Sequence, residues 1–401
     1  MDTYSRPYWF FMSAVHASAP SAATETPVPG ETVAPASKGE IKALTGLRGI
    51  AALYVVIFHV NGHYLFPSTF RPFIRHGYMA VDLFFILSGF VMAMTYAGMF
   101  SDGFSIKNFK QFLLLRLARI YPLFAFMTLL TAVLIGTVMT KVSTVPDLPK
   151  GLIYNFALIQ AWGLSNSIVP PSWSISTEWT AYLLFPLSLW GALKVPRRWT
   201  VAGLVLSFAV LAMIAYGPQW IAKQPLAYRH GPLDIASSYA IGTSLRCLAS
   251  FFIGLVAYRF REHIPSRASL ALLGLTVILL CLKGSDLFLV GVFALLIMAL
   301  SHDEGPVARW LHTPWVYWLG LVSYALYLIH DLVLRIVFRM LPGWGVHGVP
   351  AEVWVLVTLA VSIGLAGLSH YAFEKPSRRW FRRFLVGNYQ AGSGSAPIKA
   401  S

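Results

Sequence analysis

About ten long apolar runs divide this chain of 401 residues, and they leave it few folds to adopt. Each run is about 20 residues long, which is the length of an α-helix that crosses the hydrocarbon core of a bilayer. Such segments fold as helices, because a helix satisfies its backbone hydrogen bonds within itself. We therefore predict an all-α, polytopic membrane protein with about ten transmembrane helices. By hydropathy they lie at roughly 44–63, 78–98, 119–139, 177–194, 199–216, 241–258, 268–282, 285–301, 316–338 and 352–374.

The composition fits a membrane protein, since 57% of the residues are hydrophobic and only 12% are charged. The net charge of +15 raises the question of nucleic-acid binding. Most of the lysines and arginines lie in short loops between apolar runs, where they set orientation, and no basic helix or aromatic–basic motif is present. We therefore expect no nucleic-acid partner. Cys247 and Cys281 both fall in apolar runs and form neither a disulfide framework nor a metal-binding pattern, so no metal is expected.

The ends of the chain differ from its middle in composition. Residues 1–40 are rich in Ala, Pro, Ser, Thr and Glu without helical periodicity, which predicts a disordered leader. Residues 41–380 form the predicted membrane domain, and 381–401 a cytoplasmic tail. By the positive-inside rule both termini are cytoplasmic, and we expect a multi-pass protein of the cytoplasmic (inner) membrane. This orientation rests on the basic residues after the second, fourth and sixth runs and in the tail: Lys107, Lys110, Arg116, Arg119, Lys194, Arg197, Arg198, Arg259, Arg261, Arg267, Lys375, Arg378, Arg379, Arg382 and Arg383.

Two polar side chains, Arg48 and His59, lie in the first apolar run. Placing such side chains in the hydrocarbon core costs free energy, so residues of this kind usually have a function there. Eleven residues of α-helix make about three turns, so the two side chains share nearly one face. They lie roughly 16 Å apart along the axis, about half the hydrocarbon thickness of a bilayer. The loop charges put Arg48 near the cytoplasmic end and His59 near the outer end. One polar helix face is thus predicted to join two depths of the membrane.

Arg116 and Arg119 open the third run and, three residues apart, share a helix face. Pro122 is tolerated there if it lies in the first turn, which lacks internal N–H partners. The two arginines either anchor the helix by snorkelling or clamp phosphate at the cytoplasmic mouth. The second interpretation follows because a guanidinium group binds phosphate through two parallel hydrogen bonds.

Glu178 stands near the start of the fourth run, after Trp173 and Ser174. In one interpretation Thr177 or Ser176 caps a helix and Glu178 lies at the positive end of its dipole. In the other, Glu178 is a partly desolvated carboxylate that faces a cavity at the outer leaflet. Both interpretations place Glu178 near the outer surface.

His330 lies toward the outer end of the ninth run, at a depth similar to that expected for His59 and Glu178. Tyr324 and Tyr327 precede it at three-residue spacing, which packing alone can explain. A single intramembrane histidine usually bonds to a neighbouring helix. Two histidines at matched depth beside a carboxylate indicate a proton-handling cluster.

The second run contains Asp82 near its outer end and the small pair Ser88-Gly89. We expect Ser88-Gly89 to permit close helix packing, in preference to contact with substrate. Asp82 is a candidate partner for one of the histidines.

Together these motifs resemble the acyltransferase-3 family of integral membrane acyltransferases, in its stand-alone form of the polysaccharide O-acetyltransferase type. The resemblance covers about residues 42–380, and its specificity lies in the joint order and spacing of the motifs. They are Arg48 with ten residues before His59, Phe84-Phe85-x-x-Ser88-Gly89-Phe90, Arg116-x-x-Arg119, Trp173-Ser174 with Glu178, Ser323-Tyr324-x-x-Tyr327-x-x-His330, and Phe373-Glu374-x-Pro376.

The resemblance implies transfer of an acyl group, usually acetyl, from cytoplasmic acetyl-CoA to a hydroxyl of an extracytoplasmic or lipid-linked carbohydrate such as an exopolysaccharide. It implies that Arg48 and His59 are the functional signature and that Arg116 and Arg119 are tied to the acyl donor. The expected partners are acyl-CoA, a carbohydrate acceptor and the lipid bilayer. Some relatives carry a C-terminal esterase-like domain, and the short tail after Arg382 predicts the form without it.

A mechanism follows as a hypothesis. Phosphates of coenzyme A dock on Arg116 and Arg119, helped by Arg48, and His59 is the general base on the acceptor hydroxyl. Glu178 orients His59, and His330 or Tyr324 donates to the developing oxyanion. An acyl-enzyme on His59 or Ser88 is left open. The predicted catalytic residues are His59, Glu178 and His330, the donor-binding residues Arg48, Arg116 and Arg119, and the substrate or supporting residues Tyr324, Ser88, Asp82 and Trp173.

A proton-coupled secondary transporter is the main alternative, because intramembrane Arg, His and Glu also suit proton-coupled transport. Against it, the sequence has no internal repeat and no matched pair of helices broken by Gly or Pro. A receptor or scaffold is a third class, and it has no need of a phosphate clamp. The acceptor, the acyl chain length and the oligomeric state are not determined by the sequence.

Overall fold

The computed structural model describes residues 40–138, 145–343 and 348–384. Every regular element in these ranges is a helix, so the predicted all-α, polytopic membrane fold is confirmed. The predicted leader, apart from residue 40, and most of the predicted tail lie outside the described residues.

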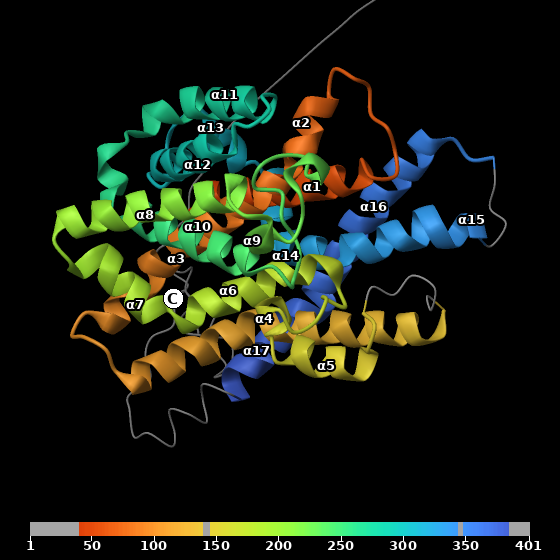
Figure 1. The fold of residues 1–401 in the computed structure, drawn as a ribbon, viewed down its shortest axis with the longest axis horizontal. Coiled ribbons are helices and arrows are strands. Elements are labelled where there is room, and N and C mark those ends of the chain that lie inside the picture. Colours follow the sequence, from red (N-terminus) through yellow and green to blue (C-terminus); the bar gives the residue numbers. More distant parts are fainter. Residues whose placement is uncertain (1–39, 139–144, 344–347, 385–401) are drawn as a thin grey trace, which may run out of the picture. The chain divides into compact units, whose positions relative to one another are not determined.

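The helices are α1 (Lys42–Val60), α2 (Arg71–Arg75), α3 (Ala80–Tyr96), α4 (Ile106–Thr137), α5 (Leu148–Phe156), α6 (Trp173–Leu183), α7 (Phe185–Leu189), α8 (Arg197–Tyr216), α9 (Gln219–Ala222), α10 (Ile241–Phe260), α11 (Ser269–Leu280), α12 (Asp286–Leu300), α13 (Gly305–Leu311), α14 (Pro314–Arg335), α15 (Leu341–Gly343), α16 (Ala351–Ser369) and α17 (Lys375–Arg382). Short 3₁₀ and π-helical turns join many of them (Figure 1). They are η1 (His76–Met79), η2 (Ala97–Phe100), η4 (Gln160–Trp162), η5 (Pro170–Ser172), η6 (Trp190–Lys194), η7 (Leu226–Tyr228), η8 (Arg261–His263), η9 (Ser266–Ala268), η10 (Ile336–Met340) and η11 (His370–Glu374).

The expected count of about ten spans needs correction. Among the described residues, 7 helices are long and apolar enough to cross a membrane, or up to 8 if the bent pair α12 and α13 counts as one span. The axes of that pair differ by 87°. The predicted span at 268–282 is α11, which is only 12 residues long. Hydropathy counts apolar residues in a window, and it does not register whether the helix is continuous.

The predicted span at 177–194 is broken into α6, α7 and η6. Pro186 stands at the start of α7, where a proline cannot continue the hydrogen bonding of the preceding helix. α6 begins at Trp173, after the turn η5, so Ser176 and Thr177 lie inside the helix and do not cap it. Their hydroxyls bond instead to the backbone: Ser176 Oγ accepts from Ala161 and donates to Leu158, and Thr177 donates to Ser174.

α4 begins much earlier than hydropathy suggests. Its first residue is Ile106, capped by the side chain of Ser105, so the arginines expected at a helix entrance lie about three turns inside it. Pro122 is therefore in the helix interior and buried, contrary to the expectation that it occupies the first turn. The polar first turns of α4 have low hydropathy, which is why the window placed the start too late.

Glycine brings α1 and α14 into close contact. A Cβ on Gly49 would lie 2.5 Å from the backbone nitrogen of Gly320, and one on Gly320 would lie 2.1 Å from the carbonyl oxygen of Thr45. Small residues at such positions let helix backbones approach and gain van der Waals contact, which is a main source of association inside a membrane. The two helices are thereby held together along a shared seam.

A second close pair is α3 and α10. A Cβ on Gly89 would lie 2.0 Å from the carbonyl oxygen of Phe251, and one on Gly254 would lie 2.1 Å from that of Ile86. The close packing expected at Ser88-Gly89 is therefore confirmed at Gly89.

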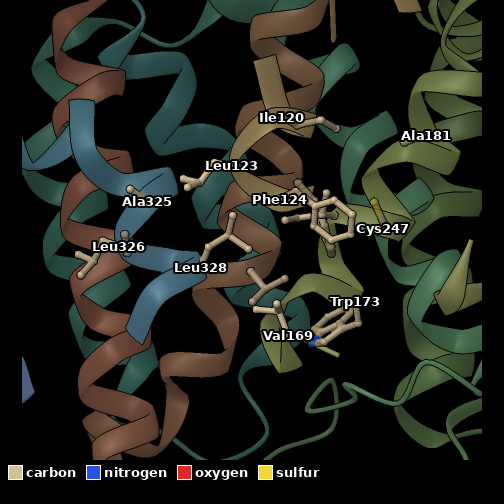
Figure 2. Close-up of a cluster of buried hydrophobic side chains, with 14 of the residues drawn as sticks. Ile120, Leu123, Phe124, Val169, Trp173, Ala181, Cys247, Ala325, Leu326 and Leu328 are labelled. Carbon is tan, nitrogen blue, oxygen red and sulfur yellow. The ribbon is translucent and has the colours of Figure 1, made fainter. Parts of the chain in front are cut away.

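The main apolar core lies between these pairs and α4. Figure 2 shows Ile120, Leu123 and Phe124 of α4 close to side chains of α6, α10 and α14. The neighbours drawn there include Trp173 and Ala181 of α6, Cys247 of α10, and Ala325, Leu326 and Leu328 of α14, all buried. This core fixes α4 against α14, which matters for the polar groups described below.

We expect Gly320→Ala to destabilise the protein by about 1–3 kcal/mol, because the new methyl group overpacks the α1–α14 seam. Thermal unfolding of the purified protein in detergent measures the change. Gly364→Ala is the matched control in α16, since a Cβ there meets nothing within 4 Å. That control should be neutral or stabilise by roughly 0.5–1 kcal/mol. Equal melting temperatures for the two variants would contradict the assigned role of the seam.

Candidate functional site

His59 and His330 meet across the α1–α14 seam. His330 Nε2 lies 3.3 Å from His59 Nδ1, and the ring centroids are 4.9 Å apart. The contacts show that the two helices run parallel. Arg48 of α1 contacts Gly320 and Ser323 of α14. His59 and His330 then meet about three turns further along both helices. His330 is fully buried, and His59 is half-buried. We call this part of the bundle the histidine end.

The hydrogen bonds of the pair define where its protons lie. His59 Nδ1 is 2.9 Å from the carbonyl oxygen of Val55, and His330 Nδ1 is 3.2 Å from that of Leu326. A carbonyl oxygen only accepts, so each Nδ1 carries the hydrogen in the neutral ring. His59 Nδ1–H can then also donate to the lone pair on His330 Nε2. His59 Nε2 is left as an unprotonated nitrogen, and no hydrogen bond engages it within the described residues.

Arg48 lies at the opposite end of the same seam. Its Nε donates to Ser323 Oγ and its Nη2 to the carbonyl oxygen of Gly320, each over 2.9 Å. Ser323 in turn donates to the same carbonyl. Arg48 is half-buried, and these contacts leave part of its guanidinium group unbonded. We call the region around Arg48, Arg116 and Arg119 the arginine end.

Arg116 begins a chain of hydrogen bonds that ends at Glu178. Its Nη2 donates to the Tyr182 hydroxyl over 3.0 Å, and its guanidinium carbon lies 4.9 Å from the centre of that ring. The Tyr182 hydroxyl donates to Glu178 over 2.6 Å, and Ser88 Oγ also donates to Glu178. Arg116 is 5% exposed, and its Nε is buried without a partner. These hydrogen bonds orient one face of the Arg116 guanidinium group and leave its Nε–H without an acceptor.

These hydrogen bonds give Glu178 other partners than the sequence-based expectation did. Its hydrogen bonds go to Ser88 and Tyr182, and through Tyr182 it is tied to Arg116. The expected contact between Glu178 and His59 is not among the contacts of the described residues. α6 starts at Trp173, so Glu178 lies more than one turn inside this helix and not in its first turn, where the sequence-based expectation placed it.

Arg119 lies in the same region, and the charges of Arg116, Arg48 and Arg378 act on it. Tyr324, the predicted substrate or supporting residue, donates its hydroxyl hydrogen to the carbonyl of Ile120 over 2.5 Å and thereby ties α14 to α4. The sequence-based mechanism needed Tyr324 or His330 as an oxyanion donor. In this arrangement Tyr324 donates to Ile120, and His330 Nδ1 donates to Leu326, so both hydrogens are already engaged.

Asp82 does not partner a histidine, which corrects the expectation from the sequence. It forms a buried, two-oxygen ion pair with Arg246 of α10, and Ser250 Oγ donates to it over 3.1 Å. Arg246 also donates to the carbonyls of Ile235 and Tyr78. Every nitrogen of this guanidinium group is therefore bonded within the protein.

Trp173 covers that ion pair. Its ring centre lies 6.0 Å from the guanidinium carbon of Arg246, and the ring packs against Phe85. This arrangement makes Trp173 a supporting residue of the α3–α10–α6 packing. Tyr327, one turn before His330, bonds to Ser174 over 2.8 Å and to the carbonyl of Pro171.

Sequence reasoning missed two polar residues of these networks. Arg246 and Tyr182 both lie in apolar runs, and a charged residue in such a run is the signal that could have flagged Arg246. Glu374, which one of the motifs contains, is buried and bonds to His370, with Nδ1 and Oε2 3.0 Å apart in the π-helical turn η11. Within the described ranges no three His, Cys, Asp or Glu side chains gather as metal ligands would.

Comparisons with known proteins give a consistent result. A family model described as an acyltransferase domain matches residues 41–369. The acyltransferase MdmB of Streptomyces mycarofaciens is 30% identical over 377 residues, which are 86% of this chain and 93% of that protein. The peptidoglycan O-acetyltransferase OatA of Listeria monocytogenes is 24% identical over 88% of this chain, and the putative peptidoglycan O-acetyltransferase YrhL of Bacillus subtilis is 24% identical over 86%. The matches span only 59% and 56% of those two proteins. No solved structure matches the chain.

We expect Arg246→Met to destabilise the protein by about 3–5 kcal/mol, because it leaves the buried charge of Asp82 without its partner. The double variant Asp82→Leu, Arg246→Met removes both charges and should recover most of that loss. Thermal unfolding in detergent and the yield of folded protein measure both effects. A single variant as stable as the original protein would show that the ion pair has no such structural role.

Proposed function

This chain belongs to the acyltransferase-3 family of membrane acyltransferases, and on that basis we propose that it moves an acetyl group from acetyl-coenzyme A to a hydroxyl of a carbohydrate. One observation carries the proposal: the α1–α14 seam has Arg48 at one end, with part of its guanidinium group unbonded, and at the other end His59, whose Nε2 has no hydrogen bond within the described residues. The two ends are roughly 16 Å apart along α1. A donor with a charged nucleotide and a long, neutral thioester arm suits that separation.

At the arginine end, Arg48, Arg116 and Arg119 would hold the phosphates of the donor. A guanidinium group binds phosphate in a two-pronged geometry, and several of the nitrogens here are not bonded within the protein. Ser323 and Tyr182 hold Arg48 and Arg116 in place through hydrogen bonds. Glu178, bonded to Tyr182, is in this proposal a positioning residue for Arg116 and does not touch the reacting atoms.

At the histidine end, His59 Nε2 would accept the proton of the acceptor hydroxyl as its oxygen attacks the thioester carbonyl. A new C–O bond forms, the carbonyl electrons move onto oxygen, and the tetrahedral intermediate then breaks its C–S bond. The departing thiolate takes the proton back from His59 Nε2, which leaves an acetyl ester and the free thiol of coenzyme A. His59 ends in the state in which it began.

His330 is the positioning residue for His59 in this scheme. It accepts the hydrogen of His59 Nδ1, and its own Nδ1 is held by the carbonyl of Leu326. The arrangement keeps Nε2 of His59 free to act as the base and offers a partner to the imidazolium that forms.

We place the arginine end at the cytoplasmic face of the inner membrane, with both termini cytoplasmic. The basic residues at the start of α4 (Lys107 and Lys110) and at the end of α10 (Arg259 and Arg261) support this orientation, because cytoplasmic loops carry the excess of Lys and Arg. A cytoplasmic coenzyme A thioester would then meet the arginines first. His59 would face an acceptor from the outer side.

The acceptor class is suggested by the relatives. Two of them are named as peptidoglycan O-acetyltransferases, one of these putatively, although this chain spans less than two thirds of either. A polymer or lipid-linked glycan outside the cytoplasm is the acceptor that this proposal favours. The relatives are named acyltransferases and not transporters, which favours group transfer over proton-coupled transport.

We expect His59→Ala to lower acetyl transfer by roughly 100- to 10,000-fold, because it removes the general base. The measurement is the passage of label from acetyl-coenzyme A to surface glycan in membranes that contain the protein. His263→Ala, in the exposed turn η8, is the matched control and should keep full activity. Full activity of His59→Ala, with the variant folded in the membrane, would rule out this mechanism.

We expect His330→Phe to lower kcat by roughly 2- to 13-fold without changing the KM for acetyl-coenzyme A. Phenylalanine keeps an aromatic ring in the core but cannot accept the hydrogen of His59 Nδ1, and a single hydrogen bond is worth about 0.5–1.5 kcal/mol. Initial rates at several donor concentrations separate the two parameters. A rise in KM at unchanged kcat would instead place His330 in donor binding.

A further inference from the structure

We propose that Arg378 of α17 is a fourth arginine of the donor site and contacts a phosphate group of the donor. The inference rests on the proposed function and extends it to a residue, Arg378, that is in none of the motifs quoted above and was not among the donor residues expected from the sequence. Arg378 would be a binding residue, with no part in the chemistry at the histidine end.

Helix geometry turns Arg378 toward the bundle. α16, η11 and α17 follow one another without a break, and Glu374 is buried at 5% exposure. Arg378 follows Glu374 by four residues and therefore lies on the same face, one turn further along. It is half-buried, whereas its neighbour Arg379 is exposed. α17 packs against α4, the helix of Arg116 and Arg119, as Figure 1 also shows.

The packing of α17 against α4 brings the charge of Arg378 within reach of the donor arginines. Its positive charge acts on both Arg48 and Arg119, and Arg116 acts on the same two residues. Four guanidinium groups from α1, α4 and α17 are thus gathered in one partly buried region. Like charges in such surroundings repel one another, and the repulsion is relieved when a polyanion binds between them.

Three carboxylates, those of Glu374, Glu40 and Glu178, offset part of the positive charge of these arginines. Each is bonded to other groups: Glu374 to His370, Glu40 to Thr45 and Tyr317, and Glu178 to Ser88 and Tyr182. None of the three forms a direct ion pair with an arginine in the part of the chain that the structure describes. Arg119 and Arg378 have no hydrogen-bond partner there either, and Nε of Arg116 is buried and unpartnered.

The N–H groups of these arginines that have no hydrogen-bond partner indicate a ligand that is an anion with several oxygen atoms. The phosphates of a coenzyme A thioester have that chemistry, and so does the headgroup of an anionic phospholipid. The coenzyme A thioester fits the cluster better than the lipid headgroup does, because the cluster includes Arg48, which lies on the α1–α14 seam that leads to His59. A lipid headgroup would not need a connection to the histidine end.

The test is equilibrium binding of labelled coenzyme A to the purified full-length chain in detergent, which needs no acceptor. We expect Arg378→Gln to raise the Kd by about tenfold to a hundredfold, the loss of one charge-assisted hydrogen-bonded contact. Arg378→Lys keeps the positive charge but not the planar, forked geometry of the guanidinium group. Its Kd should therefore lie between that of the original protein and that of Arg378→Gln. Arg379→Gln, one residue along and exposed, is the matched control and should bind as the original protein does.

A competition measurement isolates the phosphates. Acetyl-pantetheine carries the thioester arm without the nucleotide, so its weak competition with labelled coenzyme A should be unchanged by Arg378→Gln. The difference in Kd between Arg378→Gln and the original protein should also shrink at high salt, because salt screens the charge. Both results would support contact between Arg378 and a phosphate.

Three outcomes would overturn the assignment in distinguishable ways. If Arg378→Gln folds and binds coenzyme A as tightly as the Arg379→Gln control, Arg378 is not in the donor site, and the proposed function is untouched. If anionic lipid added to the detergent lowers the affinity of the original protein for coenzyme A but not that of Arg378→Gln, the residue binds lipid. If the original protein does not bind coenzyme A at all, the proposed donor fails and this inference fails with it.

Discussion

The close contact between α1 and α14 is the interaction on which the rest of the site depends. Gly49 and Gly320 let the two backbones touch, and the helices then run parallel in a fixed register. In that register Arg48 reaches Ser323 and the carbonyl of Gly320, and three turns later His59 reaches His330. Neither polar contact could form if a larger side chain held the helices apart. A packing constraint thus sets the geometry of both ends.

The arginines of the bundle fall into two groups according to what they bond. Arg246 is saturated by Asp82 and two carbonyls, so its charge is used inside the protein and serves the packing of α3 against α10. The arginines at the other end are held by few contacts and keep unbonded nitrogens. A buried charge that is fully paired is structural, whereas a gathered set of partly paired like charges is available to an anionic ligand. The proposed donor site follows from this contrast.

Much of the site could be predicted from single helices. The spacing of Arg48 and His59, and of Arg116 and Arg119, depends only on helical periodicity, and the structure keeps each pair on one helix. Glu178 was misplaced because its depth was judged from a helix start that hydropathy put too late. Asp82 was assigned to a histidine because a sequence does not reveal which of several polar residues in other helices will lie opposite. The span count failed where apolar segments were broken or short, as in α6, α7 and α11.

The sequence by itself determined that this chain is a bundle of membrane helices, which residues in them are too polar to be there without a function, and which family the motifs resemble. Those properties are local, because apolar length, helical period and motif spacing are read along one segment. Only the tertiary structure brought His330 into contact with His59, tied Glu178 to Arg116 through Tyr182, and packed the helix of Arg378 against that of Arg116 and Arg119. Which residues of different helices come into contact depends on backbone packing at glycines and on the pairing of buried polar groups. Both arise only when segments distant in the sequence meet.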